Sequence, residues 1–327
     1  MMIQKIKSGL AQILKFSFGL GIFIYFVASG HVDLAKIQRA FFSSPWILLS
    51  LSLGFLILVI STVRWRILKA SQGIRLSFKQ TLKLVFIGHF FNIVIPGTVS
   101  GDLVKVYYMT RRKDKKMAAG FSVFMDRFVG LFMMVILTFV AVLLNYSFIR
   151  SIPELAAIGR GVIMAFGISL GGLIFFLFKK EFKLSPRWPD FIRNSVTVFW
   201  AYRNHLPAVS KAGAITILTY VTNVLFFYTV AKALGENFLP LSQYFFLVPI
   251  GLFVMVIPIA PAGLGVGQGM FLMLFQWAYG QPVTIGADII TLYQLVIVCW
   301  ALVGLVIYVF HRQEASEISS EEEVVVA

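Results

Sequence analysis

The chain has 327 residues, of which 59% are hydrophobic and only 13% are charged, and its formal net charge is +15. Soluble domains carry about 25% charged residues, so this composition excludes an ordinary soluble enzyme and predicts an all-α, polytopic membrane protein. The single cysteine, Cys299, excludes an internal disulfide, and the four histidines are too scattered to have the spacing of zinc ligands. We therefore expect neither a metal site nor a cofactor.

Six apolar stretches are long enough to cross a bilayer as helices, which takes about 20 residues. The predicted spans are residues 11–29, 46–64, 118–145, 157–178, 211–233 and 289–310. The first span follows Lys5 and Lys7, as in a signal peptide, but it is long and no clear cleavage site follows it. We interpret it as a retained membrane anchor.

Two further apolar stretches are interrupted by proline and glycine, which favour a break in a helix. Residues 84–109 are interrupted at Pro96, Gly97 and Gly101, and residues 243–279 at Pro258, Pro261, Gly263 and Gly265. Each stretch is predicted to form a helical hairpin that returns the chain to the side on which it began. The arms of the first are too short for a hydrocarbon core about 30 Å thick, which favours a re-entrant hairpin. The longer arms of the second leave a fully spanning hairpin open.

The distribution of Lys and Arg predicts the orientation, because these residues concentrate in cytoplasmic segments. With the N-terminus inside, Lys105 and Arg127 lie within apolar segments and five cations lie outside, which leaves 22 of the 29 Lys and Arg inside. The outside cations are Lys36, Arg39, Arg150, Arg160 and Lys232. We therefore expect a multi-pass protein of the cytoplasmic (inner) cell membrane with both termini in the cytoplasm.

The order of these segments predicts an internal repeat. Residues 1–150 contain a span, a span, a hairpin and a span, beginning inside, and residues 151–313 contain the same series beginning outside. This is the pattern of an inverted-topology repeat, although chance is an alternative because any layout of eight segments can be halved. Residues 1–313 then form one membrane domain, and the glutamate-rich residues 314–327 are expected to be a short disordered tail.

Four ionisable residues follow the first break or lie near the inner end of the third span. Asp102 and Lys105 are three residues apart, so a helix places them on one face. Asp126 and Arg127 lie within an apolar run, where charged groups are costly and mark pathways. We expect the two cations to attract a lipid phosphate, and the two aspartates to hold them or to bind a cationic headgroup. The structural alternative is that Asp102 stabilises a helix N-terminus near Ser100 and that the neighbouring pair reaches the interface.

Polar residues on the hairpins complete the candidate site. His89 and Asn92, spaced i, i+3, could line a polar cleft or form a hydrogen bond between helices, and Asn223 in the fifth span has the same two interpretations. The backbone before Gln268 could offer N–H groups to an anion or could be a kink that allows close packing. We assign no catalytic residue. The candidate substrate-binding residues are Asp102, Lys105, Asp126, Arg127, His89, Asn92, Ser100 and Gln268.

Three motifs in order resemble a known family. They are Pro96–Lys105 (PGTVSGDLVK), Asp126–Leu131 (DRFVGL) and Pro261–Gln268 (PAGLGVGQ). Together they resemble the lysylphosphatidylglycerol synthase transmembrane (flippase-like) family over nearly the whole chain. The resemblance implies a lipid-translocating membrane domain, which the best-known members join to a soluble lysyltransferase. We expect that transferase to be absent, because no soluble region follows the last span, and Gln268 stands where the family often has Glu.

These features lead us to expect a flippase-like protein that moves or handles a phospholipid or polyprenyl-type lipid. No Walker A motif occurs, so transport would be passive or coupled to an ion or a later reaction. The alternatives are a lipid-modifying enzyme, similar to a phosphatidylglycerol lysyltransferase, or a membrane partner of an aminoacyl- or glycosyltransferase. The expected partners are lipids with anionic headgroups, which basic clusters such as residues 111–116 suit. A homo-oligomer is left open, and nucleic acid is not expected.

Overall fold

The computed structural model describes residues 17–95, 100–110, 116–178, 202–256 and 263–325, with scattered residues between 185 and 200. At residues 110, 116–117 and 311–325 it describes the backbone alone. All regular secondary structure in these ranges is helical, which confirms the predicted all-α class. The helices are Ser17–Ala28, α2 (Leu34–Ser43), α3 (Trp46–Ser71), α4 (Phe78–Val94), α5 (Ser100–Thr110), α6 (Lys116–Leu144), α7 (Tyr146–Ser151), α8 (Pro153–Phe178), η1 (Tyr202–His205), α10 (Leu206–Ala233), α11 (Leu241–Val256), α12 (Val266–Tyr279) and α13 (Ile285–Val325).

Five helical segments are long and apolar enough to cross a membrane, so the protein is a polytopic membrane protein. The five candidate spans are Trp46–Ser71, Ala118–Leu144, Pro153–Phe178, Tyr202–Ala233 and Ile285–Phe310. They confirm five of the six predicted spans. For the remaining one, predicted at residues 11–29, the structure describes a shorter apolar helix, Ser17–Ala28, and residues 11–16 lie outside the described residues.

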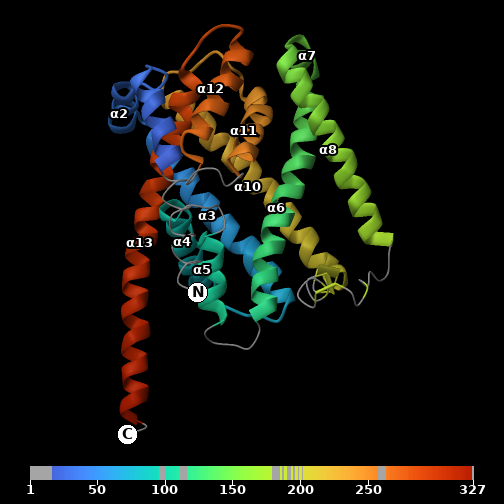
Figure 1. Ribbon diagram of the computed structural model, residues 1–327, viewed down its shortest axis with the longest axis vertical. Coiled ribbons are helices and arrows are strands. Elements are labelled where there is room, and N and C mark those ends of the chain that lie inside the picture. The colour runs from blue at the N-terminus through green and yellow to red at the C-terminus, as the bar shows by residue number, and fades with distance from the viewer. Residues whose placement is uncertain are drawn as a thin grey trace.

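Each of the two interrupted stretches forms a pair of helices, α4 with α5 and α11 with α12. Figure 1 shows the first pair in the lower half of the molecule and the second pair in the upper half. Among the predicted break residues, Gly263 and Gly265 have positive φ angles of 69° and 79°, a conformation that favours glycine. Gly101 differs from the prediction, since it lies inside the first turn of α5. The other four, Pro96, Gly97, Pro258 and Pro261, lie outside the described residues.

The helices approach one another closely at glycines, as is typical of membrane proteins. A Cβ atom on Gly101 would overlap the carbonyl oxygen of Gly88, so these two glycines bring the backbones of α4 and α5 into contact. Gly304 in α13 is pressed in the same way against the Phe86 carbonyl of α4. Gly101 is therefore a packing position, and its lack of a side chain fixes the separation of the hairpin arms.

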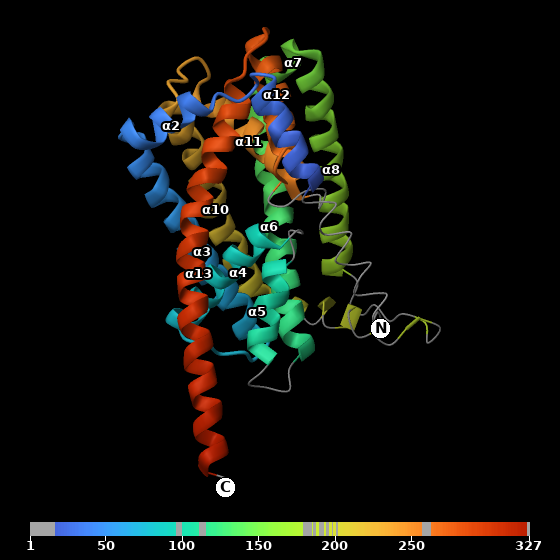
Figure 2. The same cartoon turned by 60° about the vertical axis from the view of Figure 1, so that its left-hand side comes forward.

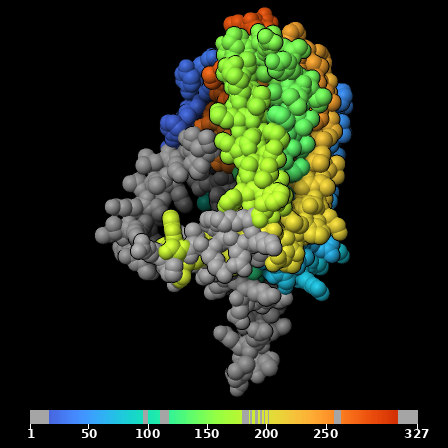
Figure 3. Space-filling view, turned by 90° about the vertical axis from the view of Figure 1, so that its right-hand side faces the viewer, coloured from blue at the N-terminus to red at the C-terminus, as the bar shows by residue number. Residues whose placement is uncertain are grey.

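The largest hydrophobic core lies where α10, α12 and α13 pack together. Phe227 stacks on Phe271 with ring centroids 5.1 Å apart and on Tyr293 at 4.1 Å. In contrast, α8 buries little, since only Leu155 and Gly159 are fully buried along it, and Figure 3 shows it along one face of the molecule. Its apolar residues are therefore suited to contact lipid.

The last helix continues beyond the predicted span. The backbone of α13 is helical to Val325, so residues 314–325, for which we expected a disordered tail, extend the helix of the last span. Figure 2 shows this extension projecting past the lower end of the helical bundle. Five of the twelve residues 314–325 are Glu, which is favourable in helices.

Candidate functional site

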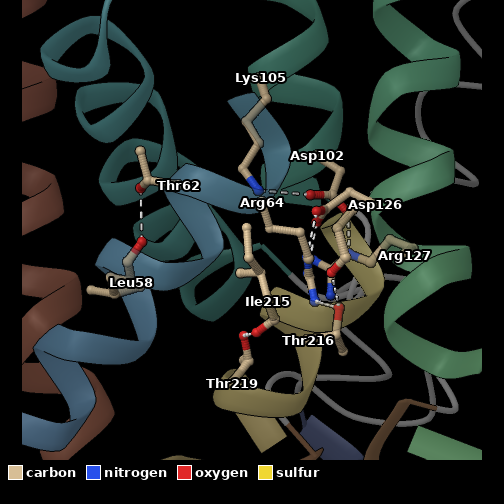
Figure 4. Close-up of polar contacts among 11 residues, drawn as sticks. Leu58, Thr62, Arg64, Asp102, Lys105, Asp126, Arg127, Ile215, Thr216 and Thr219 are labelled. Atoms are coloured by element: carbon tan, nitrogen blue, oxygen red, sulfur yellow. Dashed lines mark hydrogen bonds and ion pairs between the residues drawn. The ribbon is translucent and has the colours of Figure 1, made fainter. Parts of the chain in front are cut away.

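Three helices bring five charged side chains together. Arg64 comes from α3, Asp102 and Lys105 from α5, and Asp126 and Arg127 from α6, and Figure 4 shows them converging. Arg64 and Asp126 lie inside two of the candidate spans, about two turns from one end of each. The structure therefore brings together all four ionisable residues predicted from the sequence and adds Arg64.

Asp102 bridges two cations with its two carboxylate oxygens. Lys105 Nζ lies 3.0 Å from Asp102 Oδ1, which agrees with their predicted position on one helix face. Arg127 Nε donates to Asp102 Oδ2 at 2.7 Å and so connects α5 to α6. The Asp102 side chain is only 5% exposed, and a carboxylate this buried is stable only when paired. This geometry agrees with the expectation that the aspartates hold the cations.

Asp126 pairs with Arg64 rather than with its neighbour in sequence. Arg64 Nε donates to Asp126 Oδ1 at 2.7 Å and Arg64 Nη2 to Asp126 Oδ2 at 2.9 Å, so the contact is bidentate. Arg64 Nη1 also lies 3.4 Å from Thr216 Oγ1 in α10. From its position in the sequence, Arg64 is one of the 22 Lys and Arg residues expected in the cytoplasm, and its pairing with Asp126 was not predicted.

One further cation of α3, Lys69, lies close to this group, on the ring of Trp65. Lys69 is completely buried, its Nζ donates to Thr81 Oγ1, and it lies 4.7 Å from the centroid of the Trp65 ring. Lys105 Nζ lies 5.5 Å from the same ring centroid, within the range of a cation–π interaction. Among the described residues, three cations, at residues 64, 105 and 127, thus contact two carboxylates, and Lys69 shares the Trp65 ring with Lys105. This excess of positive charge in a membrane-embedded location favours an anionic ligand.

Arg127 is the member of the network that a ligand reaches most directly, because its side chain is 51% exposed. It is flanked on α6 by Phe124 and Phe128, which are also exposed and stack with centroids 6.3 Å apart. The stack continues to Phe132 at 6.1 Å. A cation beside an exposed aromatic ladder offers a polar contact and an apolar contact on one helix face.

The polar residues of the first hairpin hold its two arms together. Asn92 Oδ1 accepts a hydrogen bond from the backbone N–H of Gly101 at 2.8 Å, which agrees with the interhelical bond considered for it. The Ser100 hydroxyl shares its hydrogen between the carbonyls of Phe91 at 2.9 Å and Ile95 at 3.1 Å, near the end of α4. His89 hydrogen-bonds to the backbone of Ile297 in α13. These contacts position Asp102 and Lys105.

Gln268 connects the second hairpin to α13. Its Oε1 accepts from the backbone N–H of Gly265 at 2.7 Å, which stabilises the first turn of α12. Its Nε2 donates to Gln294 Oε1 at 2.7 Å and to Thr291 Oγ1 at 3.2 Å in α13. Gln268 is fully buried and lies at a different break from Asp102, so the structure does not place it in the charged network. A substrate-binding role for any of these residues remains a prediction.

The fold and the network define the class: a multi-pass α-helical membrane protein with paired charges held between its helices. Comparison with protein families finds that the family described as the lysylphosphatidylglycerol synthase TM region matches residues 12–315. The chain therefore belongs to this family, which confirms the resemblance of its three motifs. Comparison with curated proteins gives no match.

Proposed function

We propose that this protein moves a lipid with a phosphate-bearing headgroup, a phospholipid or a polyprenyl phosphate, between the leaflets of the cytoplasmic membrane. One observation carries the proposal: a network with more cations than carboxylates is embedded in the span region and opens through Arg127, half-exposed beside Phe124 and Phe128. A guanidinium matches the oxygens of a phosphate in geometry and charge. The exposed aromatic rings can accept the acyl or prenyl chains while the phosphate engages Arg127.

The proposed movement uses the two helical hairpins. We propose that α4–α5 and α11–α12 enter the membrane from opposite sides as re-entrant elements of an inverted repeat. Their positions in opposite halves of the molecule support this arrangement (Figure 1). In transporters with such repeats, alternating access comes from one repeat rocking against the other. The Asp102–Arg127 ion pair joins the first hairpin to α6 and is therefore a contact that rocking would break and re-form.

The proposed orientation places the lower end of the molecule, as drawn in Figure 2, in the cytoplasm. The end of α13 lies there, and so does the connection from α3 to α4, which carries Arg75. Lys and Arg concentrate in cytoplasmic segments, and anionic headgroups are attracted to them at about 1 kcal/mol per charge. Under this proposal the charged network lies near the cytoplasmic leaflet and receives the lipid from it.

The proposal is tested with purified protein reconstituted into liposomes that contain fluorescent phosphatidylglycerol, phosphatidylethanolamine, phosphatidylcholine or a polyprenyl phosphate. Exchange between leaflets is measured by quenching the outer leaflet. We expect exchange of at least one phosphate lipid, and a loss of tenfold or more in Asp102→Asn and Arg127→Gln. Arg150→Gln is the matched control, because Arg150 is exposed on α7, away from the network.

Two results would overturn the proposal. The first is exchange no faster than in protein-free liposomes for every headgroup, and the second is unchanged exchange in both network variants. A lipid-modifying activity is the competing function, and chromatography of the recovered lipids tests it in the same samples. A role as partner of a lipid-modifying enzyme predicts co-purification with such an enzyme and no exchange by this chain alone.

A further inference from the structure

A cavity of about 120 Å³ lies next to Arg64, between α3, α6, α10 and α11. Its wall combines polar side chains from α3 and α10 with apolar side chains from α6, α10 and α11. The lining residues are Arg64, Gly130, Met134, Thr216, Thr219, Tyr220, Asn223, Val224, Val248, Pro249 and Leu252. Gly130, Thr219, Asn223 and Leu252 are partly exposed, so the cavity is not sealed.

Arg64 brings unused hydrogen-bond donors to this cavity. A guanidinium has five N–H groups, of which Asp126 takes two and Thr216 takes one at the long distance of 3.4 Å. The two remaining N–H groups, on Nη1 and Nη2, have no acceptor among the described residues. Arg64 is only 9% exposed, and buried donors without an acceptor are rare in proteins. An acceptor supplied by a ligand would complete its coordination.

Gly130 keeps the guanidinium uncovered. A Cβ atom at this position of α6 would lie 3.5 Å from Arg64 Nη1, which is ordinary contact. An alanine therefore fits, whereas a longer side chain would extend over the guanidinium and into the cavity that Gly130 lines. The glycine leaves room there for a ligand.

The α10 wall offers several hydrogen-bond acceptors. Thr216 and Thr219 line the cavity, and each donates its hydroxyl hydrogen to a backbone carbonyl one turn earlier, at 2.8 Å and 3.2 Å, so that its oxygen can act only as an acceptor. Asn223 donates to the Thr219 carbonyl at 3.4 Å, and its side-chain oxygen, which accepts from the Tyr293 hydroxyl at 3.5 Å, has a second lone pair for another donor. These residues are spaced i, i+3 and i+7, which places them on one helix face. A ligand that presents an anion to Arg64 and donors to α10 matches this wall.

Tyr220 and Pro249 preserve the shape of the cavity. Proline has no N–H, so Pro249 leaves the carbonyl of Phe245 without its usual helical partner, and the Tyr220 hydroxyl donates to that carbonyl instead. The bond fixes α10 against α11 and occupies the only donor of the Tyr220 side chain. Tyr220 therefore adds no donor for a phosphate, which leaves Arg64 to hold it.

We infer that this cavity binds the headgroup of a phospholipid that carries a hydrogen-bond donor, such as a glycerol hydroxyl or a primary ammonium, during its passage. The phosphodiester accepts from the free N–H groups of Arg64, and the headgroup donor points to the oxygens of Thr219 and Asn223. The inference rests on the proposed function and adds a second binding position and a preference. Phosphatidylglycerol and phosphatidylethanolamine fit it, whereas the headgroup of phosphatidylcholine has no donor.

The test fills the cavity without changing a charge. Gly130→Leu places a side chain over Arg64, while Gly130→Ala is the conservative variant and Gly120→Leu is the control on the same helix, because a Cβ at Gly120 meets no atom within 4 Å. Purified protein in detergent is titrated with each of the three phospholipids, and with inorganic phosphate, and bound lipid is counted by native mass spectrometry. We expect Gly130→Leu to weaken phosphatidylglycerol and phosphatidylethanolamine binding tenfold or more, Gly130→Ala to weaken it less, and Gly120→Leu to bind like the wild type.

A second variant covers the case in which Gly130→Leu does not fold. Thr219→Val with Asn223→Leu removes the acceptors, and we expect it to bring phosphatidylglycerol affinity down to that of phosphatidylcholine. Equal binding of all three lipids by the wild type would overturn the inference, and so would retention of the preference in these variants. Stabilisation by inorganic phosphate alone, equal to that by lipid, would assign the cavity to free phosphate.

The same proteins in liposomes separate this inference from the proposed function. Exchange that is lost in Asp102→Asn but normal in a folded Gly130→Leu variant would refute the cavity and leave the function intact. Absence of exchange in the wild type would refute the function, and the binding measurement would still decide whether the cavity holds a headgroup.

Discussion

Replacing Gly101 with alanine should separate the two arms of the first hairpin. The new Cβ would overlap the Gly88 carbonyl oxygen, and overpacking of this kind costs about 1–3 kcal/mol. The backbone bond from Gly101 N–H to Asn92 Oδ1, now 2.8 Å, would lengthen, with a loss of about 1 kcal/mol. Alanine favours a helix over glycine by up to about 1 kcal/mol. We therefore expect a net loss of about 1–3 kcal/mol in the free energy of unfolding.

The measurement is reversible unfolding in mixed micelles, with Gly120→Ala as the control, since a Cβ there meets no neighbour. Gly120→Ala should leave the free energy of unfolding unchanged or raise it. Because Asp102 follows Gly101 directly, the displacement should also weaken its bond to Arg127 and slow lipid exchange. If Gly101→Ala unfolds like the wild type while Gly120→Ala does too, the close contact between α4 and α5 does not exist and the reasoning fails.

Two double-mutant cycles test other contacts by the same unfolding assay. Asp126→Leu leaves Arg64 without its charge partner and should cost about 3 kcal/mol. Arg64→Met with Asp126→Leu should cost less than either of these two changes made alone, because a buried ion pair is often replaceable by apolar residues. Additive losses would contradict this. Tyr220→Phe leaves the Phe245 carbonyl unpaired and should cost about 1–3 kcal/mol. Adding Pro249→Ala restores a backbone donor to that carbonyl and should recover most of the loss, and no recovery would exclude the assigned hydrogen bond.

The features that sequence alone predicts are those encoded locally. Hydropathy over about 20 residues was sufficient for the span at Trp46–Ser71, and proline with glycine was sufficient to separate α11 from α12. The contact of Asp102 with Lys105 follows from helical spacing. Each of these signals lies within a short window of sequence, so no knowledge of helix packing was needed.

The pairing of Asp126 with Arg64 could not be read in this way, because the two residues are 62 positions apart. Arg64 precedes Arg66 and Lys69, and such a cluster is well explained by topology alone. The depth of Arg64 in the membrane could have indicated this pairing. Arg64 follows Trp46 by 18 residues, which is about 27 Å along a helix, and a helix of that length is still within a hydrocarbon core about 30 Å thick. Adjacent residues also diverge on a helix, so Asp126 and Arg127 needed separate partners.

The pairing pattern separates lipid binding from lipid movement. Lys105 and Asp102 belong to the same helix and move together, whereas Arg127 belongs to α6. A lipid phosphate that replaces Asp102 at Arg127 would therefore release α5 from α6, while Asp102 and Lys105 stay paired with each other. A ligand shifts a conformational equilibrium only by its differential affinity for the two states, and this exchange of partners would supply it. Asp102→Asn should therefore keep or increase phospholipid binding while exchange falls, because Arg127 is already free. Arg127→Gln should lose exchange and bind less phospholipid than the wild type, and native mass spectrometry beside the liposome assay would show whether the two variants divide in this way.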